Sequence, residues 1–256
     1  MSRHHLLGLW TMTEREVSRF LRVWQQTIIP PMITSILFIL IFGYSLSSRI
    51  TPVAGISYLQ FIIPGLVMMG MIMSAYSNSS SSLYISKFQG NIQEYLVAPV
   101  SYWQIILALT IAAVLRAMMV GISILAVSYW FVPFSIHHLP ALLYFMLMAS
   151  LLFAFAGIAT GLWASNWDNV NVFSTFILTP LTYLGGVFYS ISSLPLFWGG
   201  VAKFNPILYM VDGFRYGLIG VADVSVMFSI VLVFILTLFF FLLCVQWFRK
   251  GYKLRT

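Results

Sequence analysis

Arg116 is a lone charge in a long apolar segment, and this position suggests a functional role. It lies about 14 residues into that segment, which is about 21 Å along a helix. A charged side chain at such a depth in a membrane is costly, and it usually faces the interior of a bundle or a water-filled cavity. Two roles are therefore open for Arg116. It lines a substrate path or gate, or it holds neighbouring helices together through a charged partner or backbone carbonyls.

The polar segment 77–100 is a second candidate, and it contains the sequence LYISKFQGNIQEYLVAPV at 83–100. Its apolar residues recur at helical spacing, and a helix must end before Pro99. The pattern predicts a short amphipathic helix that carries Glu94, the only acidic residue of the segment. Such a helix either docks on a soluble partner or lies on the membrane surface without one. The residues proposed to make the contact are Lys87, Glu94, Leu96 and Pro99.

Asp212 and Arg215 form a third candidate, within the irregular stretch 191–223. Asn205 followed by Pro206 is typical of a helix start. We therefore expect two short helices in this stretch, which dip into the membrane from one side. Residues three apart on a helix can face each other, so Asp212 and Arg215 either form a salt bridge or contact a ligand directly.

Several prolines and large apolar residues are further candidates for a substrate path or gate. A proline inside a span removes a backbone hydrogen bond and can kink the helix. Methionine and aromatic side chains offer an adaptable apolar wall to an amphiphile, although ordinary packing is the alternative for all of them. These candidates are Pro64, Met68, Phe176, Pro180 and Tyr183. His137 and His138 have no cysteine or carboxylate near them in the sequence, so no metal site is expected.

The chain that must position these residues is too apolar to cover a soluble surface. Of its 256 residues, 61% are hydrophobic and 7% are charged, whereas soluble domains carry about 25% charged residues. Several uncharged runs exceed the length of about 20 residues that a helix needs to cross the hydrocarbon. We therefore expect an all-α membrane protein with a single domain, 1–256, and six transmembrane helices. The expected spans are 28–46, 58–76, 102–131, 140–163, 172–189 and 224–247.

Residues 1–27 are expected to form an amphipathic helix before the first span. Arg15, Arg19 and Arg22 share one face, and tryptophan and leucine residues lie on another, which is typical of a basic helix in the membrane interface. The alternative is an exposed leader that only adds positive charge. Lys and Arg gather in cytoplasmic loops, so the basic leader and tail place both termini in the cytoplasm and make the number of spans even. The same rule explains the net charge of +7 without nucleic acid.

No cofactor site is expected in this chain. A phosphate-binding Walker A loop needs Gly followed by Lys, and no Gly–Lys pair occurs. If ATP drives the protein, ATP and Mg²⁺ must therefore bind to a separate subunit. An ion-coupled secondary transporter or channel is the alternative, but it would normally carry carboxylates inside the membrane. A membrane-embedded enzyme would need a cluster of His, Asp or Glu in the bilayer, which the expected spans lack.

Four features, in their order along the chain, resemble the permease subunit of ABC-2 type ATP-binding-cassette exporters. The first is the basic amphipathic leader. The others are KFQGNIQEYLVAPVS at 87–101, TPLTYLGGVFYS at 179–190 and FNPILYMVDGFRYG at 204–217. Each motif is short, whereas their order and spacing are specific, and the resemblance covers nearly the whole chain.

This resemblance implies a half-transporter of six spans that pairs with a second copy of itself and binds two copies of a soluble ABC ATPase. It makes the leader a connecting helix, the block around Glu94 the coupling helix, and the segment after the fifth span a pair of re-entrant outer helices. Spans two and five would line the path between the two permeases. The implied function is export of an amphiphilic, lipid-linked or drug-like substrate across the bacterial inner membrane, among membrane lipids. The family's substrates vary too widely for the resemblance to specify one.

Overall fold

The computed structural model describes residues 3–44, 55–90 and 101–253, and every regular element in these ranges is a helix. Five helices are long and apolar enough to cross a membrane. They are Trp24–Gly43, Tyr58–Phe88, Tyr102–Phe131, Leu139–Trp163 and Val226–Arg249. The described part of the chain is therefore all-helical, with several helices that can span a membrane, as its composition predicts.

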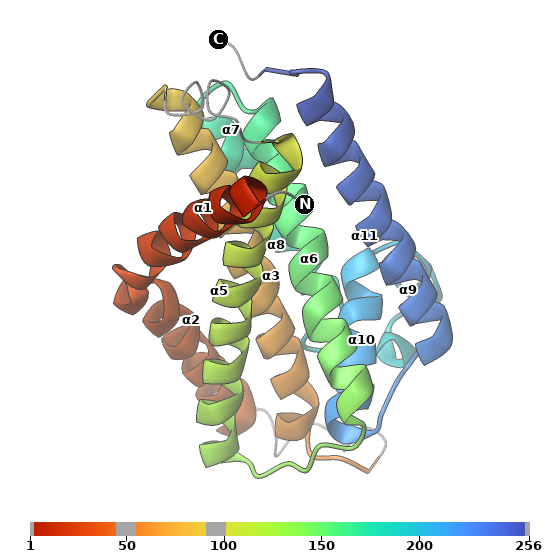
Figure 1. Ribbon diagram of the computed structural model, residues 1–256. Helices are drawn as coiled ribbons and strands as arrows, with labels where there is room; N and C mark the ends of the chain where they lie inside the picture. The colour runs from red at the N-terminus through yellow and green to blue at the C-terminus, as the bar shows by residue number, and fades with distance from the viewer. Residues whose placement is uncertain (1–2, 45–54, 91–100, 254–256) are drawn as a thin grey trace.

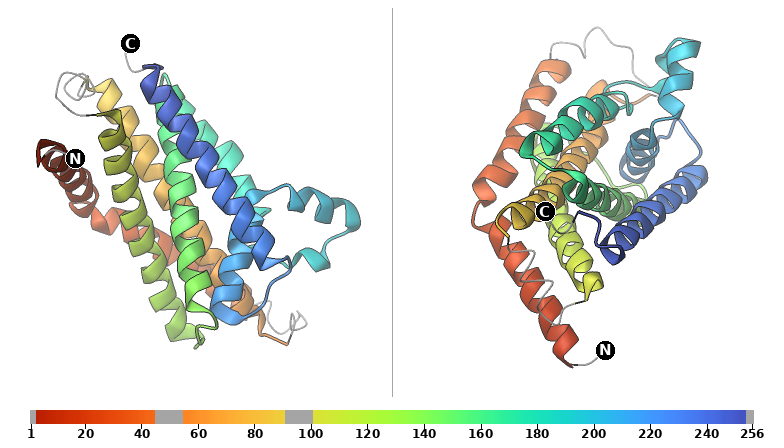
Figure 2. Two further views of the ribbon diagram at one scale, coloured as in Figure 1. Left: turned by 45° about the vertical axis from the view of Figure 1, so that its right-hand side comes forward. Right: turned by 90° about the horizontal axis from the view of Figure 1, so that it is seen from above.

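Three long helices form the centre of the bundle: α3 (Tyr58–Phe88), α5 (Tyr102–Phe131) and α6 (Leu139–Trp163). Around them, α11 packs against α6, α10 lies against α6, α11 and α3, and α1 crosses α5 (Figures 1 and 2). At one edge of the bundle, α2 lies against α5 and α3. The bounds of these outer helices are α1 (Arg3–Leu21), α2 (Trp24–Phe38), α10 (Pro206–Ile219) and α11 (Val226–Arg249).

The remaining helices are short. They are the π-helix η1 (Ile39–Tyr44), which continues α2, then α7 (Trp167–Val172), the π-helix η2 (Phe173–Leu178), α8 (Thr179–Tyr183), the 3₁₀-helix η3 (Ile191–Ser193) and α9 (Leu196–Lys203). The elements α7, η2 and α8 follow one another without a break. The segment with η3 and α9 projects to one side of the bundle (Figure 2), and its large side chains Leu196, Phe197 and Trp198 are exposed.

Glycines allow α6 to approach α3 closely. A Cβ atom at Gly157 would lie 2.6 Å from the carbonyl oxygen of Tyr76, and one at Gly161 would lie 3.0 Å from that of Ser80. The distance at Gly157 is too short for a side chain and the one at Gly161 is tight, so glycine favours the close contact between the two backbones. The close contact keeps α3 in the middle of the apolar core.

The expected spans 102–131 and 140–163 agree with α5 and α6 to within one residue. The second span is expected at 58–76, whereas the helix α3 runs from Tyr58 to Phe88. Its serine run does not end the helix, since the buried hydroxyls of Ser79 and Ser80 donate to the carbonyls of Ala75 and Tyr76. The first part of the segment 77–100, expected as a cytoplasmic connection, is therefore helical.

The first and last spans are shifted from their expected positions. The first span is expected at 28–46, whereas α2 begins at Trp24 and contains Pro30 and Pro31 in its interior. Only a short turn separates α2 from α1, so the amphipathic helix expected at 1–27 ends at Leu21. The last span, expected at 224–247, is found at 226–249.

The expected fifth span, 172–189, differs most from the structure. The helical run begins at Trp167, where Oδ1 of Asn166 accepts the N–H of Asn169 as a cap. It includes the π-helix η2, which ends at Leu178, two residues before Pro180. The run ends at Tyr183, and the turn that follows uses Gly186 at a φ of 71°. This shorter run is not among the five helices of membrane-crossing length.

Candidate functional site

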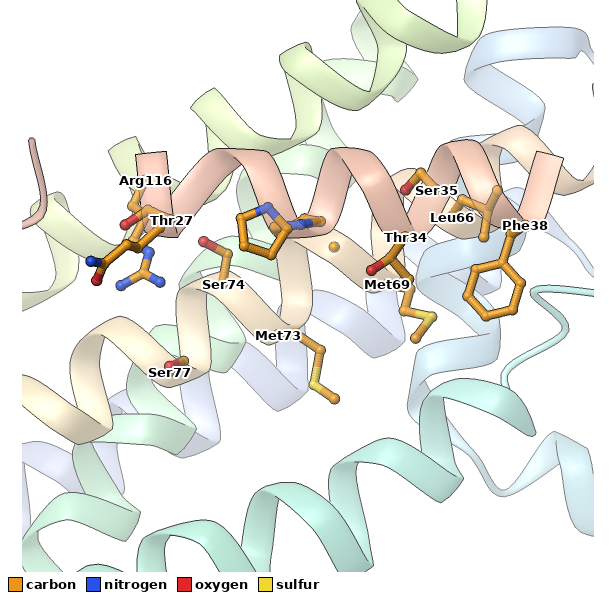
Figure 3. A pocket seen from close by; sticks show the side chains of 14 residues that line it. Thr27, Thr34, Ser35, Phe38, Leu66, Met69, Met73, Ser74, Ser77 and Arg116 are labelled. Carbon is orange, nitrogen blue, oxygen red and sulfur yellow. The ribbon is translucent and has the colours of Figure 1, made fainter. Parts of the chain in front are cut away.

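A cavity of about 360 Å³ lies between α2, α3 and α5 (Figure 3). A face of α2 forms one wall and a face of α3 the opposite wall, while Arg116 reaches it from α5. On α2, the exposed residues Gln26, Pro30 and Thr34 line the cavity at four-residue intervals. Residues spaced in this way share one helix face, so the cavity opens along that side of α2.

The two ends of the cavity differ in chemistry (Figure 3). One end holds a cation and several hydroxyl groups, which belong to Arg116, Thr27, Ser74 and Ser77. Towards the other end the wall consists mainly of apolar side chains, together with the hydroxyls of Thr34 and Ser35. These apolar residues are Phe38, Leu66, Met69 and Met73. The site is thus suited to a molecule with one polar and one apolar part.

Arg116 has no carboxylate partner in the part of the chain that the structure describes. Its Nη1 atom donates to Oδ1 of Asn78 at 3.4 Å, and both salt bridges among the described residues involve other arginines. Its buried Nε atom has no hydrogen-bond partner there, and neither does Oγ of Ser74 in the cavity wall. An uncompensated charge shielded from water is costly, so this guanidinium would be stabilised by a bound anion.

The leader helix brings a second arginine to the same asparagine. Nη2 of Arg19 on α1 donates to Oδ1 and to the backbone carbonyl of Asn78, both at 3.3 Å. Arg19 also pairs with Glu16 at 3.3 Å, and buried Glu16 accepts a 2.5 Å hydrogen bond from Oγ of Ser82. The leader is therefore attached to α3 by a polar network that also includes Arg116.

Sequence reasoning missed this network, because it placed the carboxylates outside the bundle and did not consider Asn78. Two signals were present. Glu16 and Arg19 are three apart on a helix, the spacing at which side chains meet. Ser74, Asn78 and Ser82 recur every four residues, which puts them on one face of α3.

Two prolines leave backbone acceptors at the polar end of the cavity. Pro30 and Pro31 lie inside α2, and proline has no N–H to donate to the carbonyl four residues earlier. The carbonyls of Gln26 and Thr27 therefore lack their usual helical donor, and both residues line the cavity. The hydroxyl of Thr27 donates elsewhere, to the carbonyl of Val23 at 3.0 Å.

The other residues expected at a substrate path do not line this cavity. Pro64 and Met68 are buried, and Met68 is part of the apolar core. Met69 and Met73 line the cavity in place of Met68, because adjacent residues on a helix point in different directions.

Phe176, Pro180 and Tyr183 lie on the outer surface of the chain, on η2 and α8. Phe176 is 72% exposed, and Tyr183 is 41% exposed and stacks on Phe188 at a ring distance of 5.9 Å. Pro180 is also exposed. These three side chains are available to something outside this chain, and none of them contributes to the cavity.

Lys87 binds the end of a neighbouring helix. Its ammonium group donates to the carbonyls of Gly161, Leu162 and Ala164 at 2.7 to 3.2 Å, where the last carbonyls of α6 have no helical donors. Nζ of Lys253 donates to a fourth carbonyl at the same end, that of Trp163. The other residues expected to couple to an ATPase, Glu94, Leu96 and Pro99, lie outside the described residues.

Asp212 and Arg215 form an ion pair on α10. Nη1 of Arg215 lies 3.3 Å from Oδ1 of Asp212, and each side chain is 1% exposed. Nη2 of Arg215 donates to the carbonyl of Gly186 at 2.6 Å, and its guanidinium lies 3.9 Å from the centre of the Phe61 ring. The pair thus connects α10 to the turn after α8 and to α3.

The carboxylate of Asp212 also holds the chain between α10 and α11. It accepts the backbone N–H groups of Asp223 and Val224 at 2.9 Å. Burial raises the pKa of Asp212, while these two donors and the charge of Arg215 act to lower it. At the start of the same helix, Asn205 caps by accepting the N–H of Ile207 at 3.0 Å. Asp212 is therefore occupied by structural contacts.

Comparison with known proteins shows which family this chain matches. A family model described as ABC-2 type transporter matches residues 8–219. The inner membrane transport permease YadH of Escherichia coli (strain K12) is 43% identical over 258 residues, which covers 100% of this chain and 100% of that protein.

Two more distant relatives also match. The probable multidrug ABC transporter permease YbhR of Escherichia coli (strain K12) is 23% identical over 158 residues, which is 61% of this chain and 43% of that protein. Nodulation protein J of Rhizobium leguminosarum bv. viciae is 22% identical over 204 residues, which is 77% of each chain.

Proposed function

The chain belongs to the ABC-2 type transporter family, and from this premise we propose that it is the permease subunit of an ATP-driven exporter. It moves an amphiphilic substrate out of the cytoplasm or the inner leaflet of the membrane. A separate ATPase subunit binds ATP and Mg²⁺ and hydrolyses the ATP. The chain itself is a transport subunit and not an enzyme.

The observation that carries this proposal is the cavity between α2, α3 and α5. It joins Arg116, which has no carboxylate partner among the described residues, to an apolar wall that includes Met69 and Met73. Binding sites for small molecules combine an apolar lining with a few polar groups that fix orientation. A site with one charged end and one apolar end suits an amphiphile better than a small inorganic ion.

Two parts of the chain are proposed to transmit motion of the ATPase to the cavity. One is the segment around Glu94, which would contact the ATPase as a coupling helix. The other is the leader α1, whose Arg19 and Glu16 reach the asparagine that Arg116 also contacts. A shift of the leader would thus act directly on the polar end of the cavity.

Two copies of the chain are proposed to assemble, each with one ATPase subunit. The run α7–η2–α8 exposes large apolar side chains, among them Val172, Phe176 and Ile177. Most homo-oligomers are cyclic, and dimers are the commonest. A second copy packed on this surface would enclose a path between the two chains.

Both termini are proposed to face the cytoplasm, with the protein in the bacterial inner membrane. The leader and the tail are rich in Lys and Arg, which accumulate on the cytoplasmic side. Lys87 and Lys253 both bind carbonyls at the C-terminal end of α6, so this end carries further positive charge. The printed name of the relative YadH also refers to the inner membrane.

Purification of the tagged chain from native membranes tests the proposed function. The expected result is a stable complex with a soluble ABC ATPase, whose ATP hydrolysis is changed by the permease after reconstitution in proteoliposomes. Substrate movement that needs an ion gradient, and no ATPase, would contradict the proposal and support the ion-coupled alternative.

A further inference from the structure

We propose that the cavity between α2, α3 and α5 binds an anionic lipid within a single copy of the chain. The lipid phosphate pairs with Arg116, and one acyl chain lies along Met69 and Met73. This inference rests on the proposed function, for which it names the substrate class, a phosphate-headed lipid. The cavity is lined by three helices of a single chain, α2, α3 and α5.

Charge at the polar end favours an anion. Arg19 is balanced by Glu16 at 3.3 Å, whereas Arg116 has only the neutral amide of Asn78 as a partner in the described part of the chain. The network of these four residues therefore carries one excess positive charge, at the edge of the cavity. A guanidinium binds two oxygens of a phosphate in parallel, and most of its five N–H donors remain available for this.

The groups around Arg116 complement a phosphate head. Oγ of Ser74 is buried in the cavity wall without a hydrogen-bond partner in the described residues. Ser77 lines the same cavity from a position further along α3 (Figure 3), and both hydroxyls can donate to phosphate oxygens. The carbonyls of Gln26 and Thr27, which lack helical donors because of Pro30 and Pro31, can accept hydrogen bonds from hydroxyl groups of the same head.

Arg116 lies in the middle of α5, but its neighbours on α2 place it nearer to lipid phosphates than its distance from the start of α5 suggests. The helix Trp24–Gly43 has 20 residues, and a helix of about 20 residues just crosses the hydrocarbon, which is about 30 Å thick. Its first turn therefore lies near one boundary of the hydrocarbon. Thr27 belongs to that turn and lines the same end of the cavity as Arg116 (Figure 3). A lipid bound here would keep its head close to the normal level of the leaflet.

The apolar part of the cavity distinguishes a lipid from a free phosphate ion. An ion that contacts Arg116 alone would leave the cavity-facing surfaces of Met69 and Met73, which are only partly buried, uncovered. The volume of about 360 Å³ lies at the lower end of the range for ligand sites, roughly 300–1,000 Å³. It suits a head and part of one acyl chain, and the rest of the lipid would leave through the open side along α2.

Native mass spectrometry of the purified full chain can count bound lipids. The probes are phosphatidylglycerol, phosphatidylcholine and inorganic phosphate, added to wild type, Arg116→Gln, Arg116→Lys and Arg22→Gln. Arg22 is an exposed arginine just after the leader, so its variant is a matched control for the loss of one charge. We expect one phosphatidylglycerol per chain and about tenfold or more weaker binding in Arg116→Gln. Arg116→Lys retains part of the affinity, and Arg22→Gln binds as wild type does.

Three results would overturn the inference. Equal binding of phosphatidylglycerol to wild type and Arg116→Gln would remove Arg116 from the site. Equal binding of phosphatidylcholine would show that the anionic head is not recognised. Binding of inorganic phosphate as tight as that of the lipid would make the site one for a free anion.

If Arg116→Gln does not fold, two tryptophan variants on α2 provide a second test, one that fills the cavity and one that does not. Thr34 and Ile33 are both exposed on α2, but only Thr34 is among the residues that line the cavity. Thr34→Trp should reduce lipid binding several-fold, and Ile33→Trp should leave it unchanged. Equal effects of the two would contradict the site.

The experiments distinguish failure of the lipid site from failure of the proposed permease function. If Arg116 and Thr34 prove irrelevant to lipid binding while the ATPase still co-purifies, the site fails and the permease role stands. If the lipid binds as expected but no ATPase associates, the permease role fails and the site stands.

Discussion

Arg19 on α1 and Arg116 on α5 donate to the same atom, Oδ1 of Asn78, at 3.3 and 3.4 Å. Among the described residues only Arg19 has a carboxylate partner, Glu16. Two guanidinium groups at one amide oxygen repel each other, and an anion bound to Arg116 would reduce that repulsion. Occupation of the cavity is therefore expected to hold the leader helix more firmly against α3.

The Arg19–Asn78 contact should be visible as an energetic coupling. Arg19→Gln and Asn78→Ala remove the two partners, and residues in one hydrogen-bond network show interaction energies of about 0.5–3 kcal/mol. Unfolding of the two single variants and the double variant in detergent gives this value. If the two destabilisations simply add, the contact does not contribute to the stability of the leader.

Glu16 and Glu14 offer a matched pair on the leader. Glu16 is buried between Arg19 and Ser82, whereas Glu14 is exposed. Glu16→Gln should destabilise the attached leader by about 1–3 kcal/mol, because a hydrogen-bonded charge is lost. Limited proteolysis should then cleave α1 faster than in wild type. Glu14→Gln should match wild type, and equal cleavage of both variants would rule out this role for Glu16.

Lys87 should prove structural, although the sequence pattern placed it in the coupling segment. Lys87→Met removes three hydrogen bonds to the C-terminal carbonyls of α6 and should lower the free energy of unfolding by about 1–2 kcal/mol. Exposed Lys250 provides the control variant, Lys250→Met. Unchanged stability combined with loss of ATPase binding would instead support a coupling role for Lys87.

A single cysteine at position 176 should trap the dimer. Phe176 lies on the exposed surface of η2, and the natural Cys244 is buried, so it does not interfere. Oxidative crosslinking of Phe176→Cys in native membranes should yield dimers, and Phe234→Cys, on the exposed face of α11, should not. Dimers from position 234 but not from 176 would place the second copy elsewhere.

Glu94 should contribute to ATPase recruitment. It is the only acidic residue in 77–100, and an unpaired charge left at a desolvated interface costs about 2–5 kcal/mol. Glu94→Ala should therefore weaken co-purification of the ATPase or uncouple ATP hydrolysis from transport, without loss of membrane insertion. Glu14→Ala is the control. A Glu94→Ala complex with normal recruitment, hydrolysis and transport would exclude the coupling role.

The sequence predicts the most apolar helices well and the irregular ones poorly. The bounds of α5 and α6 follow from long apolar runs with clear ends. The run Trp167–Tyr183 could not be placed, because its π-helix and the glycine turn after it depend on tertiary contacts that hydropathy does not report. By composition the serine run of α3 resembles a connection, because composition alone does not reveal that buried hydroxyls can bond back to their own helix.

For the candidate site, the sequence predicts that Arg116 is important, but it does not predict which residues contact Arg116. A lone arginine in an apolar run indicates a functional or structural centre, and Arg116 does line the cavity. Its link to Asn78 and Arg19 depends on how α1 crosses α5, which no local pattern encodes. The choice between Met68 and Met69 depends on the rotation of α3, which a helix with apolar residues on every face does not specify.

The most direct test of the central proposal is lipid movement in proteoliposomes that contain the purified permease and its ATPase. Labelled phosphatidylglycerol should move between leaflets when ATP is hydrolysed and stay in place with a non-hydrolysable analogue. Arg116→Gln should slow this movement while the ATPase remains bound. Movement driven by a proton or sodium gradient without the ATPase would contradict the proposal that this chain is the permease of an ATP-driven exporter.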